Sequence, residues 1–410
     1  MAVNVAKPVR IMSRRRFLAH SGAAAALTFS IVSPTAVRGT AANSRIEVGC
    51  IGLGQRGSMI AGMVQRHGGY HIAAVADYFP QVAAKAGETF KVPEKRRYSG
   101  LAAYQKLIAD GVDAVFLETP PYCFPDHVEA AVKAGCHVYL AKPVACDVPG
   151  SLRVLKMAQQ AQSQQKVFLI DFQTRTDPFY IEGIKRVHDG AIGKVGLLSS
   201  EYNDEAFADP PLTDTVASRF QRLIWVNDTD LGASYLVNAG IHAIDVALWI
   251  AGDTPVNATG CSRVVRSNAH GDSHDVYSLT YEFANGLILN HRGEHLKNRF
   301  GFRCDCLAQG SNGYLESGYN GQVRILANSG GYRGGQVESL YQRGAERNID
   351  TFQRSVTSGV YDNPTVEPSI NATLATILGR EAALRKTKLT WDELLKENKP
   401  LLPDLSGLTV

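Results

Sequence analysis

The sequence predicts an α/β protein with two domains. The first is expected to hold a doubly wound parallel sheet, and the second an α+β arrangement around a large, mostly antiparallel open sheet. Three observations predict this: short apolar runs alternate with helical runs in the first half, a glycine-rich turn follows the first apolar run, and long alternating strands dominate the second half. With 410 residues, 45% of them hydrophobic, the chain can bury a core in each domain.

The first 42 residues differ from the rest in charge. They contain six basic residues and no acidic one, so the remaining chain is close to neutral. The run 13–18 reads SRRRFL, and an apolar, alanine-rich run over about 22–32 follows it. This pattern resembles a twin-arginine export signal, and its apolar run is shorter than the ~20 residues that a membrane span needs. A membrane anchor or a disordered arm is the alternative.

We therefore expect an exported protein, periplasmic or otherwise extracytoplasmic, that uses the twin-arginine export machinery. After the signal, no stretch is expected to be long and apolar enough for stable membrane insertion. The near-neutral charge of the body gives no indication of a nucleic-acid partner.

Residues 43–171 are predicted to form the first domain. The expected strands cover 45–51, 71–77, 112–119, 137–142 and 166–172, and the expected helices cover 57–68, 81–90, 125–135 and 150–165. Buried apolar strands separated by helices are typical of a parallel sheet with helices on both faces.

Residues 172–410 are predicted to form the second domain. Helices are expected over 178–193, 236–252, 336–359 and 369–387, and antiparallel strands over 276–295 and 302–317. The strand segments alternate apolar and polar residues and contain Gly and Asn where a hairpin would turn.

A glycine motif follows the first expected strand. Gly52, Gly54 and Gly57 have the spacing G-x-G-x-x-G, and Asp77 ends the second strand 20 residues after Gly57. This context predicts a Rossmann domain that binds a dinucleotide. Gly52 allows a tight turn, Gly54 lets amides approach a pyrophosphate, and the helix N-terminus stabilises its charge. The predicted cofactor-binding residues here are Gly52, Leu53, Gly54, Gln55, Arg56, Gly57 and Asp77.

Asp77 also predicts the choice of cofactor. Its carboxylate is expected to hold the adenosine ribose and to repel a 2′-phosphate. The expected cofactor is therefore NAD rather than NADP.

The candidate catalytic residues are Lys142, His242 and Asn238, and Lys142 is also predicted to contact the cofactor. Lys142 follows a strand, so it should lie at the carboxyl edge of the sheet, where open α/β sheets bind ligands. Asn238, His242 and Asp245 are spaced four and three apart on one predicted helix, which places them on one face and indicates a polar cavity. A surface lysine and a core histidine are the alternatives.

Aromatic residues are candidates for sugar stacking. Tyr202, Trp225 and Tyr235 could each stack on a sugar ring, although core packing is the alternative for every one of them. No metal site is predicted, because the pairs Cys304 with Cys306 and His291 with His295 match no closed zinc motif.

The chain resembles the Gfo/Idh/MocA family of sugar and cyclitol oxidoreductases in these and several other motifs. The resemblance is carried by VGCIGLGQRG, LETPPYCFPDHVEAAVKAGCHVYLAKP, FQTRTDPFYIEGIKRVHDGAIGKV, the helix with Asn238 and His242, and the closing LTWDELL. It implies that the family's Glu-Lys-Pro motif falls on Ala141, Lys142 and Pro143, and its Asp-x-x-x-His pair on Asn238 and His242.

The resemblance also implies further site residues. Thr119, Pro120 and His127 match positions that line the cofactor, and Arg175 matches a loop that faces substrate. The predicted substrate-binding residues are therefore Arg175, Asp245, Tyr202 and Trp225.

Both carboxylates of the family pattern are absent, because Ala141 and Asn238 stand in their places. The ammonium of Lys142 thereby loses two anionic neighbours, so desolvation should lower its pKa. A partly neutral lysine can act as a base as well as a donor.

The resemblance implies an NAD-dependent oxidoreductase that acts on a hydroxyl of a sugar, cyclitol or glycoside. Export predicts a tightly bound cofactor that is recycled in place. One alternative is a redox-neutral NAD-dependent glycosidase or lyase that works through a transient keto-sugar, and another is a non-catalytic sugar-binding protein. The expected partners are a small carbohydrate and further copies of the chain, in a homodimer or homotetramer.

Overall fold

The computed structural model describes residues 45–410, except 208, 210–215, 221–223 and 268–270. The export signal predicted within residues 1–42 lies outside the described residues.

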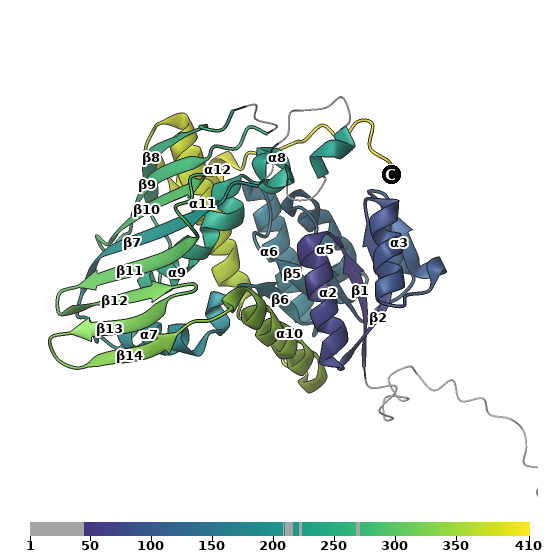
Figure 1. The fold of residues 1–410 in the computed structure, drawn as a ribbon, viewed down its shortest axis with the longest axis horizontal. Helices are drawn as coiled ribbons and strands as arrows, with labels where there is room; N and C mark the ends of the chain where they lie inside the picture. Colours follow the sequence, from purple (N-terminus) through teal and green to yellow (C-terminus); the bar gives the residue numbers. More distant parts are fainter. Residues whose placement is uncertain (1–44, 208, 210–215, 221–223, 268–270) are drawn as a thin grey trace, which may run out of the picture. The chain divides into compact units, whose positions relative to one another are not determined.

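The first sheet has six parallel strands in the order β3-β2-β1-β4-β5-β6 (Figure 1). The strands are β1 (Ile46–Ile51), β2 (Tyr70–Asp77), β3 (Arg97–Ser99), β4 (Ala114–Leu117), β5 (His137–Ala141) and β6 (Phe168–Asp171). The helices are α2 (Gln55–His67), α3 (Pro80–Thr89), α4 (Ala103–Ala109), α5 (Phe124–Lys133) and α6 (Val148–Ser163). The predicted doubly wound sheet is confirmed, with its switch point between β1 and β4.

Two elements of this domain, β3 and α4, were not predicted. Strand β3 has three residues, all half-buried, and carries no apolar run. A short edge strand of this kind is recognised by its pairing with β2 and not by its own sequence pattern.

The second sheet has nine strands in the order β14-β13-β12-β11-β7-β10-β9-β8-β15. The strands are β7 (Val195–Asp204), β8 (Asn257–Arg263), β9 (Val276–Glu282), β10 (Ile288–His295), β11 (Arg303–Gly310), β12 (Gly313–Gly318), β13 (Gln322–Ala327), β14 (Gly331–Gln336) and β15 (Leu389–Thr390). Only the pairing of β10 with β7 is parallel among the described strands of this sheet. The predicted hairpins are confirmed as β9–β10 and β11–β12.

Helices cover one side of this sheet. The helices of this half of the chain are α7 (Pro178–His188), α8 (Thr229–Gly232), α9 (Ile241–Ala251), α10 (Leu340–Ser358), α11 (Val366–Arg385) and α12 (Trp391–Glu397). Figure 1 shows α7, α9 and α11 against the sheet, and all three contact its strands. The predicted closing helices are α10 and α11.

Helix α10 also completes the core of the first domain. Ala345, Ile349 and Phe352 are buried in the same apolar cluster as β1 and β2. The hydroxyl of Tyr70 donates to the carbonyl of Ile349 at 2.6 Å. A segment of the second half of the chain therefore packs against the nucleotide-binding sheet.

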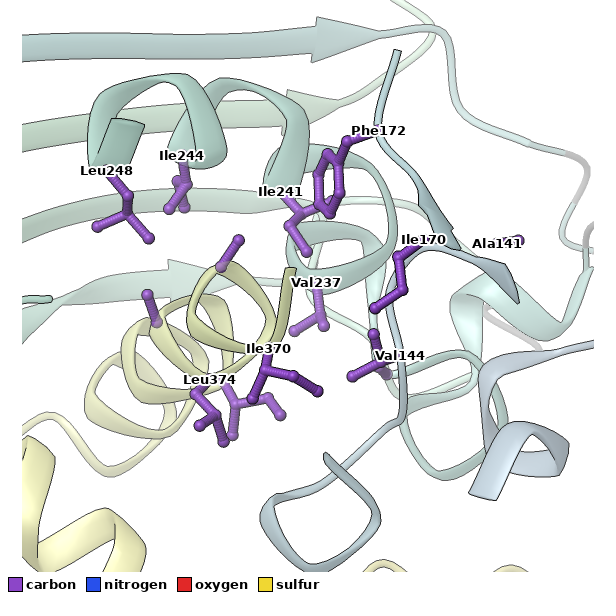
Figure 2. Packing of buried hydrophobic residues seen from close by; sticks show 14 of the residues in the cluster. Ala141, Val144, Ile170, Phe172, Val237, Ile241, Ile244, Leu248, Ile370 and Leu374 are labelled. Atoms are coloured by element: carbon purple, nitrogen blue, oxygen red, sulfur yellow. The ribbon is translucent and has the colours of Figure 1, made fainter. Parts of the chain in front are cut away.

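A second apolar cluster joins the two domains (Figure 2). It combines the ends of β5 and β6 with α9 and α11. Figure 2 shows Phe172 beside Ile241, and Ile370 facing the same interior. This packing fixes α9 beside the carboxyl edge of the parallel sheet.

One later segment is long and apolar enough to span a membrane if only length and composition are considered. On those two criteria, the expectation that no such segment would follow the signal is wrong. The helical segment Thr229–Ala251 has a mean hydropathy of 1.3 over its most apolar window, but 89% of that window is buried inside the fold. Helix α9, within this segment, contacts α11, β7 and β11. Its hydropathy reflects a position in the core.

Arg380 on α11 provides a test of how the domains are joined. Its guanidinium is 2% exposed and donates from Nη1 to the carbonyls of Cys146 (3.0 Å) and Ala233 (2.9 Å), one on each domain. We expect Arg380→Leu to lower the free energy of unfolding by about 3 kcal/mol, because both buried carbonyls lose their donor.

The matched control for this substitution is Arg385→Leu on the same helix. Arg385 is half-exposed and pairs with Glu381 and Glu397 at the surface. It should cost less than ~1 kcal/mol. Equal losses in urea denaturation would contradict the role given to Arg380.

Candidate active site

The glycine turn joins β1 to α2 at the switch point of the parallel sheet. Gly52 has a φ of +85°, and a Cβ there would lie 2.6 Å from the amide nitrogen of Thr119. A Cβ on Gly57 would lie 1.8 Å from the carbonyl oxygen of Gly52, whereas one on Gly54 would meet no heavy atom of the described chain within 4 Å. Gly52 and Gly57 are therefore required by the turn, and Gly54 leaves open space.

The start of α2 fits a phosphate group. Its N-cap is Gly54, which makes no side-chain capping bond, and no acidic residue lies in the first turn. Within the first turn of α2, the amides and the positive end of the helix dipole are therefore free of an acidic side chain from the helix itself. A pyrophosphate matches both the open space at Gly54 and this charge.

Asp77 ends β2 beside the same turn. Its carboxylate accepts the amides of Leu53 (2.7 Å) and Phe79 (3.0 Å). Burial raises the pKa of Asp77, and these amide donors oppose the rise. Leu53 itself is buried, so its part in the site is made by its backbone.

A cleft of about 140 Å³ runs from the glycine turn along the carboxyl edge. The predicted cofactor residues that line it are Gly52, Gly54, Asp77, Thr119, Pro120 and His127. Burial lowers the pKa of His127 to about 3, so the imidazole is neutral, and its Nδ1 lies 3.3 Å from the hydroxyl of Thr119.

A larger cavity of about 440 Å³ adjoins this cleft. Both are lined by Glu118, Thr119 and Trp225. The predicted residues that line the larger cavity are Gln55, Arg56, Lys142, Tyr202, Trp225, Asn238 and His242. The structure therefore brings all three predicted catalytic residues into one cavity at the end of the cofactor cleft.

Lys142 is held by the backbone of Asn238. Its Nζ donates to the carbonyl oxygen of Asn238 at 2.7 Å. Leu236–Gly240 forms a π-helical turn before α9, in place of the regular helix expected over 236–252. A π turn changes the carbonyl pairing of a helix and is frequent at functional sites. Asn238 thus positions Lys142 through its backbone carbonyl, and its predicted catalytic part is not that of a side chain alone.

Burial and, to a lesser extent, the nearby guanidinium of Arg56 lower the pKa of Lys142 to about 7. Two carboxylates, Asp171 and Glu118, oppose the fall. The direction agrees with the sequence prediction, but the assumption that the lysine has lost its anionic neighbours is wrong. The motif lacks a carboxylate, whereas the two flanking strands supply two.

Sequence reasoning missed Glu118 and Asp171. Asp171 ends β6 and is fully buried, and Glu118 directly follows β4. Arg56 contacts both: its Nε lies 3.1 Å from Glu118, and its Nη2 is bonded to Asp171. The available signal was their position at strand ends next to the strand of Lys142.

His242 is 6% exposed, and its Nδ1 has no hydrogen-bond partner among the described residues. Burial lowers its pKa well below the usual value, and the cations of Lys142 and Arg56 add to this effect. Its ring lies parallel to that of Tyr202, with centroids 6.4 Å apart. A neutral imidazole with an unpaired nitrogen on the cavity can accept a proton.

Arg175 and Asp245 do not line the cavity. Arg175 donates from Nη2 to Asp245 at 2.8 Å, and from Nε to both carboxylate oxygens. Its guanidinium also lies 5.1 Å from the ring of Trp249. Because Arg175 and Asp245 satisfy each other, we do not assign either of them to substrate. The polar helix face predicted from residue spacing extends one turn beyond the cavity, so Asp245 does not line it.

The aromatic candidates separate into two groups. Tyr202 and Trp225 line the larger cavity, as a substrate-stacking role requires. Tyr235 is fully buried, stacks on His295 at 4.8 Å and donates to the carbonyl of Glu294, so core packing applies to it.

The cysteine and histidine pairs lie in the second sheet. Cys304, Cys306, His291 and His295 are all buried, with His291 bonded to Ser200 at 2.8 Å. Within the described ranges, no group of three or more His, Cys, Asp or Glu residues could hold a metal ion.

Two family profiles match the chain. The one described as an oxidoreductase family with an NAD-binding Rossmann fold matches residues 46–169, and the GFO/IDH/MocA C-terminal domain matches residues 183–316. An inositol 2-dehydrogenase from Rhizobium meliloti (strain 1021) is 24% identical over 350 residues, which cover 83% of this chain and 96% of that protein.

Solved structures show the same fold. A levoglucosan dehydrogenase in complex with NADH and levoglucosan has a TM-score of 0.68 at 18% identity, over 84% of this chain and 99% of that one. An aldose-aldose oxidoreductase from Caulobacter crescentus complexed with glycerol has a TM-score of 0.66 at 20% identity, with the same coverage.

Substitutions at Gly57 and Gly54 should differ in their effect on stability. Gly57→Ala forces a Cβ against the Gly52 carbonyl, so we expect a loss of about 1–3 kcal/mol of stability together with dinucleotide binding. Gly54→Ala should leave the thermal midpoint unchanged and weaken dinucleotide binding by roughly tenfold or more, about 1.4 kcal/mol. Calorimetric titration and thermal melts measure both, and unchanged binding in Gly54→Ala would contradict the phosphate assignment.

Lys142 should titrate near neutral pH. In protein labelled with 13C at lysine Cε, its resonance should move with a midpoint near pH 7 instead of 10.5, because burial disfavours the ammonium. The Lys142→Met spectrum identifies the resonance. A midpoint at the ordinary lysine value would show that the site is hydrated and that this lysine is no base.

Proposed function

We propose, from the premise that the chain belongs to the Gfo/Idh/MocA family of oxidoreductases, that it oxidises a hydroxyl group of a sugar, cyclitol or glycoside with NAD. The observation that carries this proposal is the meeting of Lys142 and His242 in one cavity that continues into the dinucleotide cleft. The inositol and levoglucosan dehydrogenases similar to this chain are named for polyhydroxy ring compounds.

The cavity matches such a substrate in chemistry. Its wall combines aromatic rings, from Tyr202 and Trp225, with the polar groups of Lys142, Asn238 and His242. Sugar rings present apolar faces to aromatic side chains and hydroxyls to polar ones. The volume of about 440 Å³ leaves room for a ring substrate beside a nicotinamide.

Bound NAD+ supplies the hydride acceptor. His242 lines the cavity and is neutral, so its imidazole takes the proton of the substrate hydroxyl. Lys142, anchored to the carbonyl of Asn238, donates a hydrogen bond to the same oxygen as negative charge develops on it. Phe302, Tyr319 and Tyr202 enclose this region and limit the entry of water.

The preference for NAD over NADP is proposed from Asp77. Its carboxylate lines the cleft, and each of its oxygens already accepts a backbone amide, which favours the ionised form. An ionised carboxylate at the ribose position repels a 2′-phosphate. Tighter binding of NADPH than of NADH would contradict this choice.

Tight retention of the cofactor is supported by the residues that cover the cleft, Phe220, Tyr78 and Leu101, which we call the roof. Phe220 comes from the second domain, is 9% exposed, and lies with its ring centroid 5.5 Å from that of Tyr78 on the first domain. The C-terminal tail adds a hydrogen bond from the amide of Leu101 to the carbonyl of Thr409, at 2.9 Å. Tyr78, Leu101 and Phe220 all line the cleft.

Retention suits the proposed export by the twin-arginine route. That route carries folded proteins, so the cofactor can travel inside and be regenerated by a second substrate. The aldose-aldose oxidoreductase of the same fold is named for two sugar substrates. We also propose a homodimer or homotetramer through the uncovered side of the nine-stranded sheet, where Ile288, Asn290 and Arg292 are exposed.

A redox-neutral glycosidase or lyase is the second candidate. Elimination from a keto-sugar needs a base for a carbon-bound proton, and Lys142, with a pKa lowered to about 7, is partly neutral at physiological pH. A non-catalytic sugar-binding role is the remaining alternative, and two titratable residues that line the cavity, His242 and Glu118, argue against it because burial shifts the pKa of each.

The deciding experiment follows the reduced-nicotinamide absorbance of the purified protein. With free sugars or cyclitols the band should appear, and it should fall again when a second carbonyl sugar is added. Release of the aglycone from a glycoside with no net change in the band would favour the redox-neutral candidate instead. If no nucleotide binds and no sugar reacts, the enzymatic proposal fails.

The same assay tests the two catalytic residues. We expect Lys142→Met and His242→Ala each to lower kcat/KM by about 100-fold or more, because each removes a proton-transfer group. Lys133→Met, at an exposed lysine on α5, is the matched control and should have no effect. Unchanged activity in both site variants would favour the non-catalytic alternative.

Retention can be measured separately. Phe220→Ala opens the roof, so less nucleotide should remain with the protein through purification and dialysis. Leu402→Ala, at an 82% exposed position of the C-terminal tail, should retain as much as the wild type. Equal nucleotide content in the two variants would show that the roof does not hold the cofactor.

A further inference from the structure

Three neighbouring strands place charged groups in one row. In the order β4-β5-β6, Glu118 follows β4, Lys142 follows β5, and Asp171 ends β6. The register pairs Leu117 with Leu140 and Ala141 with Asp171, so the three strands end at the same level. Lys142 therefore lies between two carboxylates that its own strand does not supply.

The two carboxylates differ in how they are held. Asp171 is fully buried and accepts the side-chain amide of Asn348 at 2.7 Å as well as the guanidinium of Arg56. It does not line either cavity. Two side-chain donors therefore hold its carboxylate in place.

Glu118 is held more loosely. Its side chain is 3% exposed and lies 3.1 Å from Nε of Arg56, a charge contact without the alignment of a hydrogen bond. Neither of its oxygens accepts a hydrogen bond from any residue that the structure describes. It lines both the cofactor cleft and the larger cavity. A buried carboxylate whose charged contact, Arg56, is shared with Asp171 is costly to keep ionised, so it needs a functional explanation.

We propose that Glu118 is a positioning residue that sets the protonation state of Lys142 and so replaces, from the neighbouring strand, the acidic side chain absent at Ala141. The inference rests on the proposed role of Lys142 in proton transfer. Its physical basis is the charge of Glu118 inside a cavity of low polarity, where charges interact strongly.

The reciprocal pKa shifts support this arrangement. Burial raises the pKa of Glu118 to about 7, and the cations of Arg56 and Lys142 oppose the rise. Burial lowers the pKa of Lys142 to about 7, and Glu118 is one of the anions that oppose the fall. Two groups that titrate in the same range and act on each other titrate as a coupled pair.

Other groups around the pair cannot replace Glu118. The described titratable or charged neighbours are Cys50 on β1, Arg56 on α2, Tyr139 on β5, Asp171 on β6, Tyr202 and Asp204 on β7, His242 on α9, Cys304 on β11, Tyr319 after β12 and Tyr341 on α10. The carboxylates that oppose the fall in the pKa of Lys142 are Asp171 and Glu118, not Asp204. Burial raises the pKa of Cys50, Cys304, Tyr139 and Tyr319 and lowers that of His242, so these five stay neutral near pH 7. Arg56 and Asp171 pair with each other.

The test compares the titration of Lys142 in the wild type, Glu118→Gln and Asp245→Asn, in the full-length protein labelled with 13C at lysine Cε. Glu118→Gln should lower the midpoint of Lys142 by about one pH unit, a tenfold loss of proton affinity. Asp245→Asn is the matched control, because Asp245 is also a buried carboxylate paired with an arginine, and it should leave the midpoint unchanged. An unchanged midpoint in folded Glu118→Gln protein would overturn the proposal.

A reciprocal measurement covers the case in which Glu118→Gln does not fold. In protein labelled with 13C at the glutamate carboxyl carbon, Lys142→Met should raise the midpoint of Glu118, because the lysine cation that favours the carboxylate is lost. Coupling between two sites is mutual, so an unshifted Glu118 would overturn the proposal.

The pH dependence of kcat/KM adds a readout that a purely structural role would not move. In Glu118→Gln the limb assigned to Lys142 should move to lower pH, and Glu118→Asp, which keeps the charge, should restore part of the shift. Suppose that Lys142→Met loses activity, but that the midpoint of Lys142 is unshifted in Glu118→Gln and the midpoint of Glu118 is unshifted in Lys142→Met. That result would support the proposed function and overturn this inference. Shifted midpoints in a protein that oxidises no sugar would support the coupling and remove the proposed function.

Discussion

The packing of α9 and α11 against the ends of β5 and β6 is the constraint on which the site depends. The apolar cluster in Figure 2 continues through both domains, so the helix with His242 cannot move independently of the strand with Lys142. The bond from Lys142 to the carbonyl of Asn238 is made across this interface. A rigid, dry junction is what allows a lysine and a histidine from separate domains to share one cavity.

Burial then decides the chemistry of the polar groups at this junction. Desolvation is the largest cause of the lowered pKa of Lys142 and His242 and of the raised pKa of Glu118. Each of the three is pushed toward its neutral form, and Arg56 pairs with both Glu118 and Asp171 beside them. Groups that are neutral near pH 7 can exchange protons with a substrate without first losing a shell of water.

Both domains also contribute residues to the cofactor cleft. The first domain supplies the glycine turn, the start of α2 and Asp77, which together suit a pyrophosphate and a ribose. The second domain contributes Phe220 and Trp225 to the wall of the same cleft. An enzyme that works outside the cytoplasm would need this enclosure, because a cofactor lost there could not be replaced from a soluble pool.

The sequence by itself determined the two domains, the parallel sheet, the glycine turn with Asp77, and the choice of Lys142, Asn238 and His242, because each follows from local periodicity or from a motif of fixed spacing. Only the tertiary structure decided which charges surround Lys142. Glu118 and Asp171 are separated from it by 24 and 29 residues in the chain and become its neighbours through strand order. Likewise, Arg175 and Asp245 looked available for substrate until side-chain packing paired them with each other. Residue spacing predicts neighbours within one element, whereas electrostatic neighbours between elements depend on the order of strands and on burial.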